Sequence, residues 1–202
     1  MRDSDVRHTV LEMLSEKHAH DSNTRIVEEM GIWNGSVRID IAVINGEMHG
    51  FELKSERDTL ARLDDQAALY NEVFDRVTLV AALSHIEKAI ERIPVWWSVS
   101  AIVADKSGNL RLKSFRKGKR NPAVDPIQLA RLLWNSERIS LLDRYGLLRG
   151  FKSKSSDILS RRLVENLPVQ LLTREVREAL KARTNWLWQP TAHQGHMAAD
   201  SD

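Results

Sequence analysis

The chain of 202 residues contains no cysteine, which excludes disulfide bonds and thiolate metal sites. No apolar run approaches the ~20 residues that a membrane-spanning helix needs. The start of the chain, Met1 to Asp5, is mostly charged and does not resemble a signal peptide. Internal repeats, phosphate-binding P-loops and serine-nucleophile motifs are also absent. These absences predict a globular protein with no membrane partner, long enough for one α/β domain and a small appendage, and the lack of cysteine is compatible with a cytoplasmic location.

Charge is unevenly distributed along the chain, although the net charge is only +2. Residues 1–105 contain 11 Lys and Arg against 19 Asp and Glu, a net charge of −8. Residues 106–202 contain 19 against 9, a net charge of +10. An acidic half suits cation ligands and a basic half suits phosphate. The alternative is that the two halves attract each other within the fold.

The segment from Arg38 to Lys54 has the pattern of a β-hairpin with charged residues on one face. Apolar and polar side chains alternate along it, as in strands that pack on a core. One face is expected to carry Ile39, Ile41, Val43, Phe51 and Leu53, and the other Asp40, Ala42, Gly50, Glu52 and Lys54. Three charged side chains on one strand face need a chemical reason.

Asp40, Glu52 and Lys54 together indicate phosphodiester cleavage. Two carboxylates in a shielded place repel each other unless a cation neutralises them. Carboxylate oxygens, with waters and substrate phosphate, suit Mg²⁺ or Mn²⁺. Lys54 lies two residues beyond Glu52 and so points to the same side, where it can orient water or offset charge on phosphorus. We expect these three residues to be catalytic and the two carboxylates to bind the metal.

The register of the hairpin decides whether the two carboxylates meet, because a slip of one residue moves side chains to the opposite face. A two-residue Asn45-Gly46 turn would set Asp40 opposite Phe51 and separate them. A three-residue loop from Ile44 to Gly46, with glycine in the left-handed conformation, would set Asp40 across from Gly50 and diagonal to Glu52. The chemistry predicts the longer loop or a bulge.

These residues resemble the motif of the PD-(D/E)XK nuclease superfamily, an aspartate on one strand followed on the next by acid-x-lysine. Asp40 matches the first part and Glu52-Leu53-Lys54 the second, with Ile39 where the superfamily often has proline. The next helical segment contains Gln66 and Tyr70, which resemble the Gln-x-x-x-Tyr motif of RecB-type nuclease domains. The resemblance extends to small bacterial and phage proteins with this hairpin and helix.

The expected order of elements agrees with that resemblance. A helix from Asp3 or Ser4 to about Lys17 and a strand from Thr24 to Met30 precede the hairpin. A helix from Asp58 to Phe74 and a strand from Val77 to Leu83 follow it. The resemblance therefore implies a restriction-endonuclease-like αβββαβ core with a mixed sheet.

Five residues outside the hairpin are also candidates for the site. Glu12, in the middle of the first helix, could add a metal ligand, as could Glu29 at the end of the first strand. Arg62, Gln66 and Tyr70 fall at i, i+4 and i+8, one row along a helix, where they could contact nucleic acid. The alternatives are a solvated Glu12 and an ordinary amphipathic helix with a half-buried tyrosine.

The second half of the chain adds a basic strand end and helices. Four cations flank Gly118 and are candidates for phosphate contacts, or are merely solvated: Arg116, Lys117, Lys119 and Arg120. A strand is expected to start at Ile93 and to run through Ser98 to Ala104, and its Trp96 and Trp97 are expected to close a core rather than to stack on bases. After Pro122 and Pro126, helices are expected over 127–134, 137–145, 157–166 and 173–182.

The sequence predicts three regions: a nuclease-like domain over residues 1–120, a basic helical extension over 121–188 and a disordered tail over 189–202. We expect a Mg²⁺- or Mn²⁺-dependent nuclease, with DNA as its main partner. A catalytically inactive nucleic-acid-binding or partner-binding module, and a structural domain with a solvated polar hairpin face, remain alternatives. The choice between DNA and RNA, endo- and exonucleolytic cleavage, and monomer and homodimer stays open.

Overall fold

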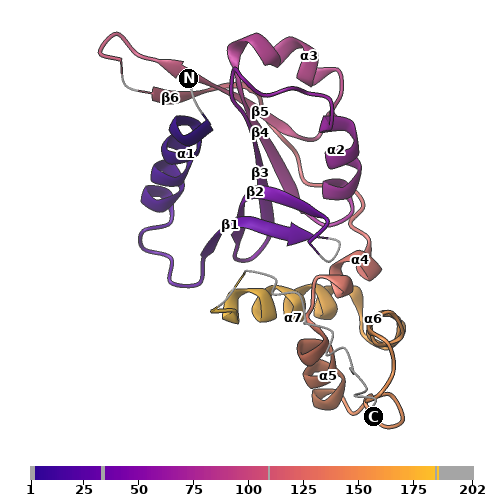
Figure 1. The fold of residues 1–202 in the computed structure, drawn as a ribbon. Coiled ribbons are helices and arrows are strands. Elements are labelled where there is room, and N and C mark those ends of the chain that lie inside the picture. The colour runs from indigo at the N-terminus through magenta and orange to yellow at the C-terminus, as the bar shows by residue number, and fades with distance from the viewer. Residues whose placement is uncertain (1–2, 33–34, 109, 185, 187–202) are drawn as a thin grey trace, which may run out of the picture.

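A six-stranded mixed sheet forms the centre of the structure (Figure 1), a computed structural model that describes residues 3–32, 35–108, 110–184 and 186. The strands lie in chain order, and the β3–β4 and β4–β5 pairs are parallel while the other neighbours are antiparallel. They are β1 (Arg25–Ile32), β2 (Val37–Ile44), β3 (Met48–Lys54), β4 (Arg76–Ala82), β5 (Ser98–Ala104) and β6 (Leu110–Arg116). The predicted α/β fold with a mixed sheet is confirmed.

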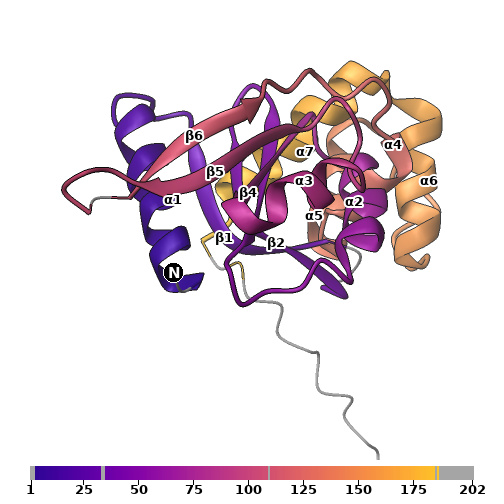
Figure 2. The same cartoon turned by 90° about the horizontal axis from the view of Figure 1, so that it is seen from above.

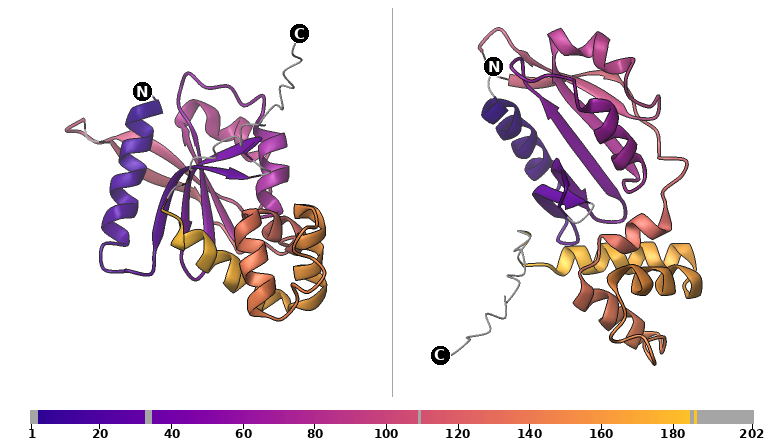
Figure 3. Two further views of the ribbon diagram at one scale, coloured as in Figure 1. Left: turned by 60° about the horizontal axis from the view of Figure 1, so that its bottom comes forward. Right: turned by 45° about the vertical axis from the view of Figure 1, so that its right-hand side comes forward.

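Helices cover both faces of this sheet (Figures 2 and 3). Helix α1 (Asp3–Lys17) buries Val6, Val10 and Leu14, spaced at i, i+4 and i+8, against one face. The opposite face is covered by α2 (Leu63–Asn71), the short 3₁₀ turn η1 (Leu83–His85) and α3 (Ile86–Ile90). The central strand β4 is apolar almost throughout because it is covered on both sides.

The connection between β3 and α2 differs from the sequence prediction of a helix starting at Asp58. The Asp58 carboxylate accepts hydrogen bonds from the backbone N–H and the hydroxyl of Ser55, at 2.7 and 2.6 Å. This closes a turn directly after β3, and the helix begins only at Leu63. A side-chain carboxylate that accepts a hydrogen bond from the backbone of a turn stabilises that turn in place of a helix.

Between β4 and β5 the chain forms η1 and α3. The strand expected to start at Ile93 begins only at Ser98, as β5. Trp97 is completely buried and Trp96 nearly so. Trp97 donates its indole N–H to Asn71 at 2.9 Å and stacks on Tyr70. The expectation that the tryptophan pair closes the core is confirmed.

Four helices follow the sheet and gather at one end of it (Figure 1). They are α4 (Pro126–Arg131), α5 (Asn135–Arg144), α6 (Ser156–Asn166) and α7 (Val169–Ala182). Their apolar residues join the same buried cluster as the α2 face of the sheet, so the core is continuous between the predicted regions 1–120 and 121–188. The predicted tail, 189–202, lies outside the described residues. Within the described part of the chain, no helix has both the length and the apolar character needed to cross a membrane.

Candidate functional site

The β2–β3 hairpin brings Asp40 and Glu52 face to face. The ladder pairs Ile41 with Phe51 and Ile44 with Met48, leaving a three-residue loop from Asn45 to Glu47. Asn45 closes this loop, since its Oδ1 accepts from the Glu47 N–H at 3.1 Å and its own N–H donates to the Glu47 carbonyl at 3.0 Å. One further step of the ladder sets Asp40 directly across from Glu52.

The loop length was predicted correctly, but its position and conformation were not. The loop begins one residue later than expected, and Gly46 does not have the positive φ that was predicted for it. Asp40 is therefore opposite Glu52 and not Gly50. The charge of Glu52 acts on Asp40, so the two carboxylates lie near each other, although Arg7 of α1 contacts Asp40 and Tyr70 of α2 contacts Glu52.

The regular alternation of faces breaks at the level of Asp40. Ile39 packs in the cluster on the α2 side, whereas Ile41 packs on the α1 side, so the prediction that both share one face is wrong for Ile39. On the neighbouring strand, Glu29 has a φ of 51°, which is uncommon for a residue other than glycine. The β1–β2 ladder pairs Glu28 with Ile41 and Met30 with Ile39 and is interrupted between these pairs, at Glu29 and Asp40. Glu29, Asp40 and Glu52 thus come from three neighbouring strands.

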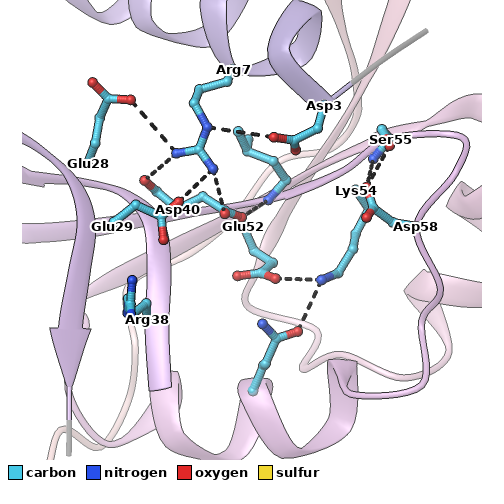
Figure 4. A network of polar contacts seen from close by, with 12 residues as sticks. Asp3, Arg7, Glu28, Glu29, Arg38, Asp40, Glu52, Lys54, Ser55 and Asp58 are labelled. Carbon is cyan, nitrogen blue, oxygen red and sulfur yellow. Dashed lines mark hydrogen bonds and ion pairs between the residues drawn. The ribbon is translucent and has the colours of Figure 1, made fainter. Parts of the chain in front are cut away.

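Asp40 is fixed by contacts to two elements (Figure 4). Its Oδ2 accepts from the backbone N–H of Leu53 at 2.8 Å. Arg7, reaching from α1, donates to Asp40 Oδ1 at 3.0 Å and to the Asp40 carbonyl at 3.1 Å. Burial, and then the nearby charge of Glu52, raise the pKa of Asp40 to about 6, against the opposing effects of these hydrogen bonds and cations.

Glu52 and Lys54 form a buried ion pair on the α2 side of the sheet. They are 2% and 7% exposed, and Lys54 Nζ lies 2.6 Å from Glu52 Oε1. Lys54 also donates to Gln66 Oε1 at 3.1 Å. The Tyr70 hydroxyl lies 2.8 Å from both Glu52 Oε2 and the Arg38 carbonyl, and Gln66 donates to that hydroxyl at 3.3 Å. The structure therefore joins Gln66 and Tyr70 to the predicted acid and lysine.

The position of Tyr70 gives it a different role from the predicted contact with nucleic acid. Its side chain is completely buried, and burial together with the charge of Glu52 raises the pKa of its hydroxyl far above the usual range. It therefore stays a neutral donor that orients Glu52. Gln66 is half-buried, and Arg62 is exposed immediately before α2.

Arg7 belongs to the site, although sequence reasoning missed it. Its guanidinium contacts Glu29 at 2.8 Å as well as Asp40, and lies 3.8 Å from Glu28 and from Asp3. A basic residue among the apolar positions of the first helix is too common a pattern to identify it. Only the packing of α1 against β2 shows that this arginine faces a buried carboxylate.

The two additional metal-ligand candidates lie in different surroundings. Glu29 is beside Asp40 but is ion-paired with Arg7. Glu12 is exposed on α1, where it contacts His8 at 3.1 Å. Glu29 is thus at the site, while Glu12 is a surface residue.

The basic residues near Gly118 divide into structural and exposed ones. Arg116 donates to the carbonyls of Trp97 and Pro94 at 2.9 and 2.8 Å, and Arg120 donates to Asp75 at 2.9 Å. Lys117 and Lys119 are exposed. The two arginines hold the fold together locally, so their predicted use as phosphate contacts competes with these bonds.

The donor set fits a hard divalent cation with few protein ligands. No group of three or more His, Asp or Glu side chains arranged for a metal occurs in the described ranges. Asp40 and Glu52 nevertheless supply two opposed carboxylates, and Mg²⁺ is typically bound by one or two carboxylates with water and phosphate. Burial, and after it the charge of Glu52, raise the pKa of Asp40. A cation would relieve that repulsion.

Comparisons with known proteins identify relatives over most of the chain. A family model described as "Bacteriophage P4 protein cII" matches residues 1–199. Protein cII of Enterobacteria phage P4 is 31% identical over 180 residues, which are 88% of this chain and 64% of that protein. The chain therefore spans less than two thirds of the length of this relative.

Two solved structures share a distant likeness. A protein of unknown function from Silicibacter pomeroyi has 17% sequence identity and a TM-score of 0.41, covering 77% of this chain and 97% of that chain. SfsA from Pyrococcus furiosus, in complex with Ca²⁺, has 13% identity and a TM-score of 0.36, covering 58% and 65%. With TM-scores this low, neither likeness bears on the site.

Proposed function

We propose that this chain, which belongs to the bacteriophage P4 protein cII family, is a metal-dependent nuclease that hydrolyses phosphodiester bonds in DNA. The observation that carries the proposal is the meeting of Asp40, Glu52 and Lys54 across two neighbouring strands. A cytoplasmic location suits such a substrate. The basic second half of the chain supplies charge that can attract the nucleic-acid backbone.

Asp40 and Glu52 would hold the cation, and the contacts around them keep both carboxylates in place. Leu53 N–H and Arg7 orient Asp40, while Tyr70 and Lys54 orient Glu52. When bound, Mg²⁺ or Mn²⁺ would supply positive charge that polarises the phosphate and neutralises the two carboxylates. Preorganised carboxylates of this kind need no rearrangement before substrate binds.

Lys54 is the residue best placed to act on the reacting phosphate. Its ammonium group has three donors, of which two are directed at Glu52 and Gln66. The third can hold a water molecule or a phosphate oxygen. Gln66 fixes the direction of Lys54, and Arg62, exposed beside α2, can contact the strand being cleaved.

A cleavage assay tests the proposal. The full chain is incubated with supercoiled, linear, branched and single-stranded DNA, with and without Mg²⁺ or Mn²⁺. We expect cleavage that requires the cation and is lost in Asp40→Asn and Lys54→Met, while melting temperatures confirm that both variants are folded. Glu165→Gln and Lys88→Met, which alter exposed residues of the same types, serve as matched controls and should cleave normally. Absence of cleavage of every substrate would refute the proposal.

One observation favours the second candidate, an inactive nucleic-acid-binding module. All four carboxylate oxygens of Asp40 and Glu52 already accept hydrogen bonds within the protein. In that case Arg7 and Lys54 act as permanent counter-ions. Titration calorimetry separates the two: an active site predicts Mn²⁺ binding that Asp40→Asn abolishes, and the inactive module predicts no binding.

A further inference from the structure

The outer face of β6 is exposed and positively charged. β6 is an edge strand that pairs only with β5, and Figures 1 and 2 show the β5–β6 hairpin extending past α1. Arg111, Lys113 and Phe115 alternate along the strand and are all exposed, with Phe115 at 44%. We call these three residues the β6 face.

A β-bulge interrupts the β5–β6 ladder at Phe115. Ser100 pairs with Ser114 and Val99 with Arg116, so Phe115 is an additional residue without a partner on β5. Bulges of this kind change the direction in which a side chain points. Lys113 Nζ lies 5.4 Å from the centre of the Phe115 ring, which shows that both side chains are on the same side. Arg116 anchors the strand here through the carbonyls of Trp97 and Pro94.

The β6 face is on the same side of the sheet as Lys54. Cross-strand partners share a face, and one row of partners runs from Lys54 through Ala81 and Ala101 to Lys113. Three strand spacings separate the two lysines, about 14 Å between backbones. Ala81 and Ala101, which lie between the two lysines, are completely buried in the core, so the row fixes the side of the sheet but offers no open path for a ligand between them.

An exposed aromatic ring beside cations is an arrangement that suits single-stranded nucleic acid. Each unpaired base has an open ring face that can stack on an aromatic side chain, while cations contact the phosphates. Paired bases in a duplex hide those faces. No carboxylate is among the three side chains of the β6 face, so the charge is not cancelled within it.

We propose that the β6 face binds single-stranded nucleic acid, with a base stacked on Phe115 and the backbone beside Arg111 and Lys113. Cleavage of the bound strand at Asp40, Glu52 and Lys54 would be a separate step. This last step rests on the proposed nuclease function, whereas the binding itself does not require cleavage.

Fluorescence anisotropy tests the binding with the full chain carrying Asp40→Asn in EDTA, so that no cleavage occurs. The probes are a labelled oligo-dT strand and a labelled duplex of equal length. We expect tighter binding of oligo-dT, and Phe115→Ala should weaken it about 5- to 100-fold, the effect of losing one stacked base. Phe115→Trp should retain it. Ile158→Ala removes an apolar side chain of similar exposure, 42%, on α6, and should change nothing.

Salt dependence tests the charged part of the β6 face. Lys113→Gln should reduce the slope of log affinity against log salt by about 0.7, the value for one phosphate contact with a single strand. Unchanged oligo-dT binding in Phe115→Ala, or preference for duplex, would overturn the inference. Loss of oligo-dT binding in Phe115→Ala, in a protein that cleaves nothing, would uphold the inference and refute only the nuclease. If Phe115→Ala does not change the cleavage of single strands, the nuclease is supported and binding by the β6 face is refuted.

Discussion

Asp40 carries an electrostatic conflict, since its half-buried carboxylate lies near that of Glu52 and is compensated only in part by Arg7. Its pKa of about 6 means that the folded state holds a proton which the unfolded chain, with a pKa near 3.8, has already lost. Raising the pH through this window therefore destabilises the fold. A bound cation would remove this penalty by favouring the ionised carboxylate.

Asp40→Asn should stabilise the protein more at alkaline than at acidic pH, because it removes this buried charge. Linkage gives a relative gain of about 2 kcal/mol between about pH 4.5 and about pH 8, measured by urea unfolding of parent and variant. Asp64→Asn is the control, since Asp64 is exposed and its hydrogen bond with Arg92 lowers its pKa. A gain that does not change with pH would contradict the assigned titration of Asp40.

Tyr70→Phe should destabilise the protein by about 2 kcal/mol, because it removes a donor from a buried carboxylate and leaves the Glu52 Oε2 atom without it. Tyr145→Phe is a matched control: the Tyr145 hydroxyl contacts Glu175 at 3.0 Å, but Arg144 and Arg174 also contact that carboxylate. The control should lose less than about 1 kcal/mol. Equal losses in urea unfolding would show that Tyr70 does not hold Glu52.

At the level of elements, the sequence predicts what depends on local pattern. Apolar spacing located α1 and the strands, and the alternation in β3 placed Glu52 and Lys54 on one side. Interactions between distant elements were not predictable: Arg7 reaches Asp40 across 33 residues, and Asp58 caps a turn where helical periodicity suggested a helix. The one-residue error in loop position arose because Asn45, and not a left-handed Gly46, closes the hairpin.

Two glycines of the site hairpin should respond differently to alanine. A Cβ on Gly50 would meet Ile39 Cδ1 at 2.4 Å and Phe74 at 3.3 Å, whereas a Cβ on Gly46 would meet nothing within 4 Å. Gly50→Ala should therefore destabilise the fold by about 1 to 3 kcal/mol through overpacking. Gly46→Ala should remain within about 0.5 kcal/mol of the parent. Urea unfolding gives both values, and a neutral Gly50→Ala would show that Ile39, next to Asp40, can move aside.

On the scale of the whole molecule, the acidic and basic halves of the chain attract each other directly. Asp75, at the start of β4, is buried and contacts Arg120 and Arg177, both from the basic half. Its Oδ2 also accepts from the Met48 N–H at 2.8 Å. The alternative explanation for the charge asymmetry, attraction within the fold, therefore accounts for part of it. Arg111 and Lys113 of β6 are exposed, and within the described part of the chain they take no part in the ion pairs of Asp75.

Arg177 connects helix α7 to the hairpin that carries the candidate site. It donates to Asp75 Oδ2 at 2.7 Å and to the carbonyl of Gly46 in the hairpin loop at 2.6 Å. The side chains of this ion pair are only 12% and 7% exposed. The C-terminal helices thus hold the loop whose conformation sets the register between Asp40 and Glu52.

Arg177→Met should destabilise the protein by about 1.5 to 3 kcal/mol, because it removes a hydrogen bond to the buried Asp75 carboxylate, which keeps its contact with Arg120. Arg161→Met breaks an ion pair with Asp157 whose side chains are 63% and 43% exposed, and should lose less than about 1 kcal/mol. Urea unfolding compares the two, and hydrogen exchange at Met48 reports on the hairpin. Faster exchange at Met48 in Arg177→Met alone would show that α7 stabilises the site from a distance. Equal losses for the two variants would mean that the C-terminal helices do not support the hairpin through Arg177.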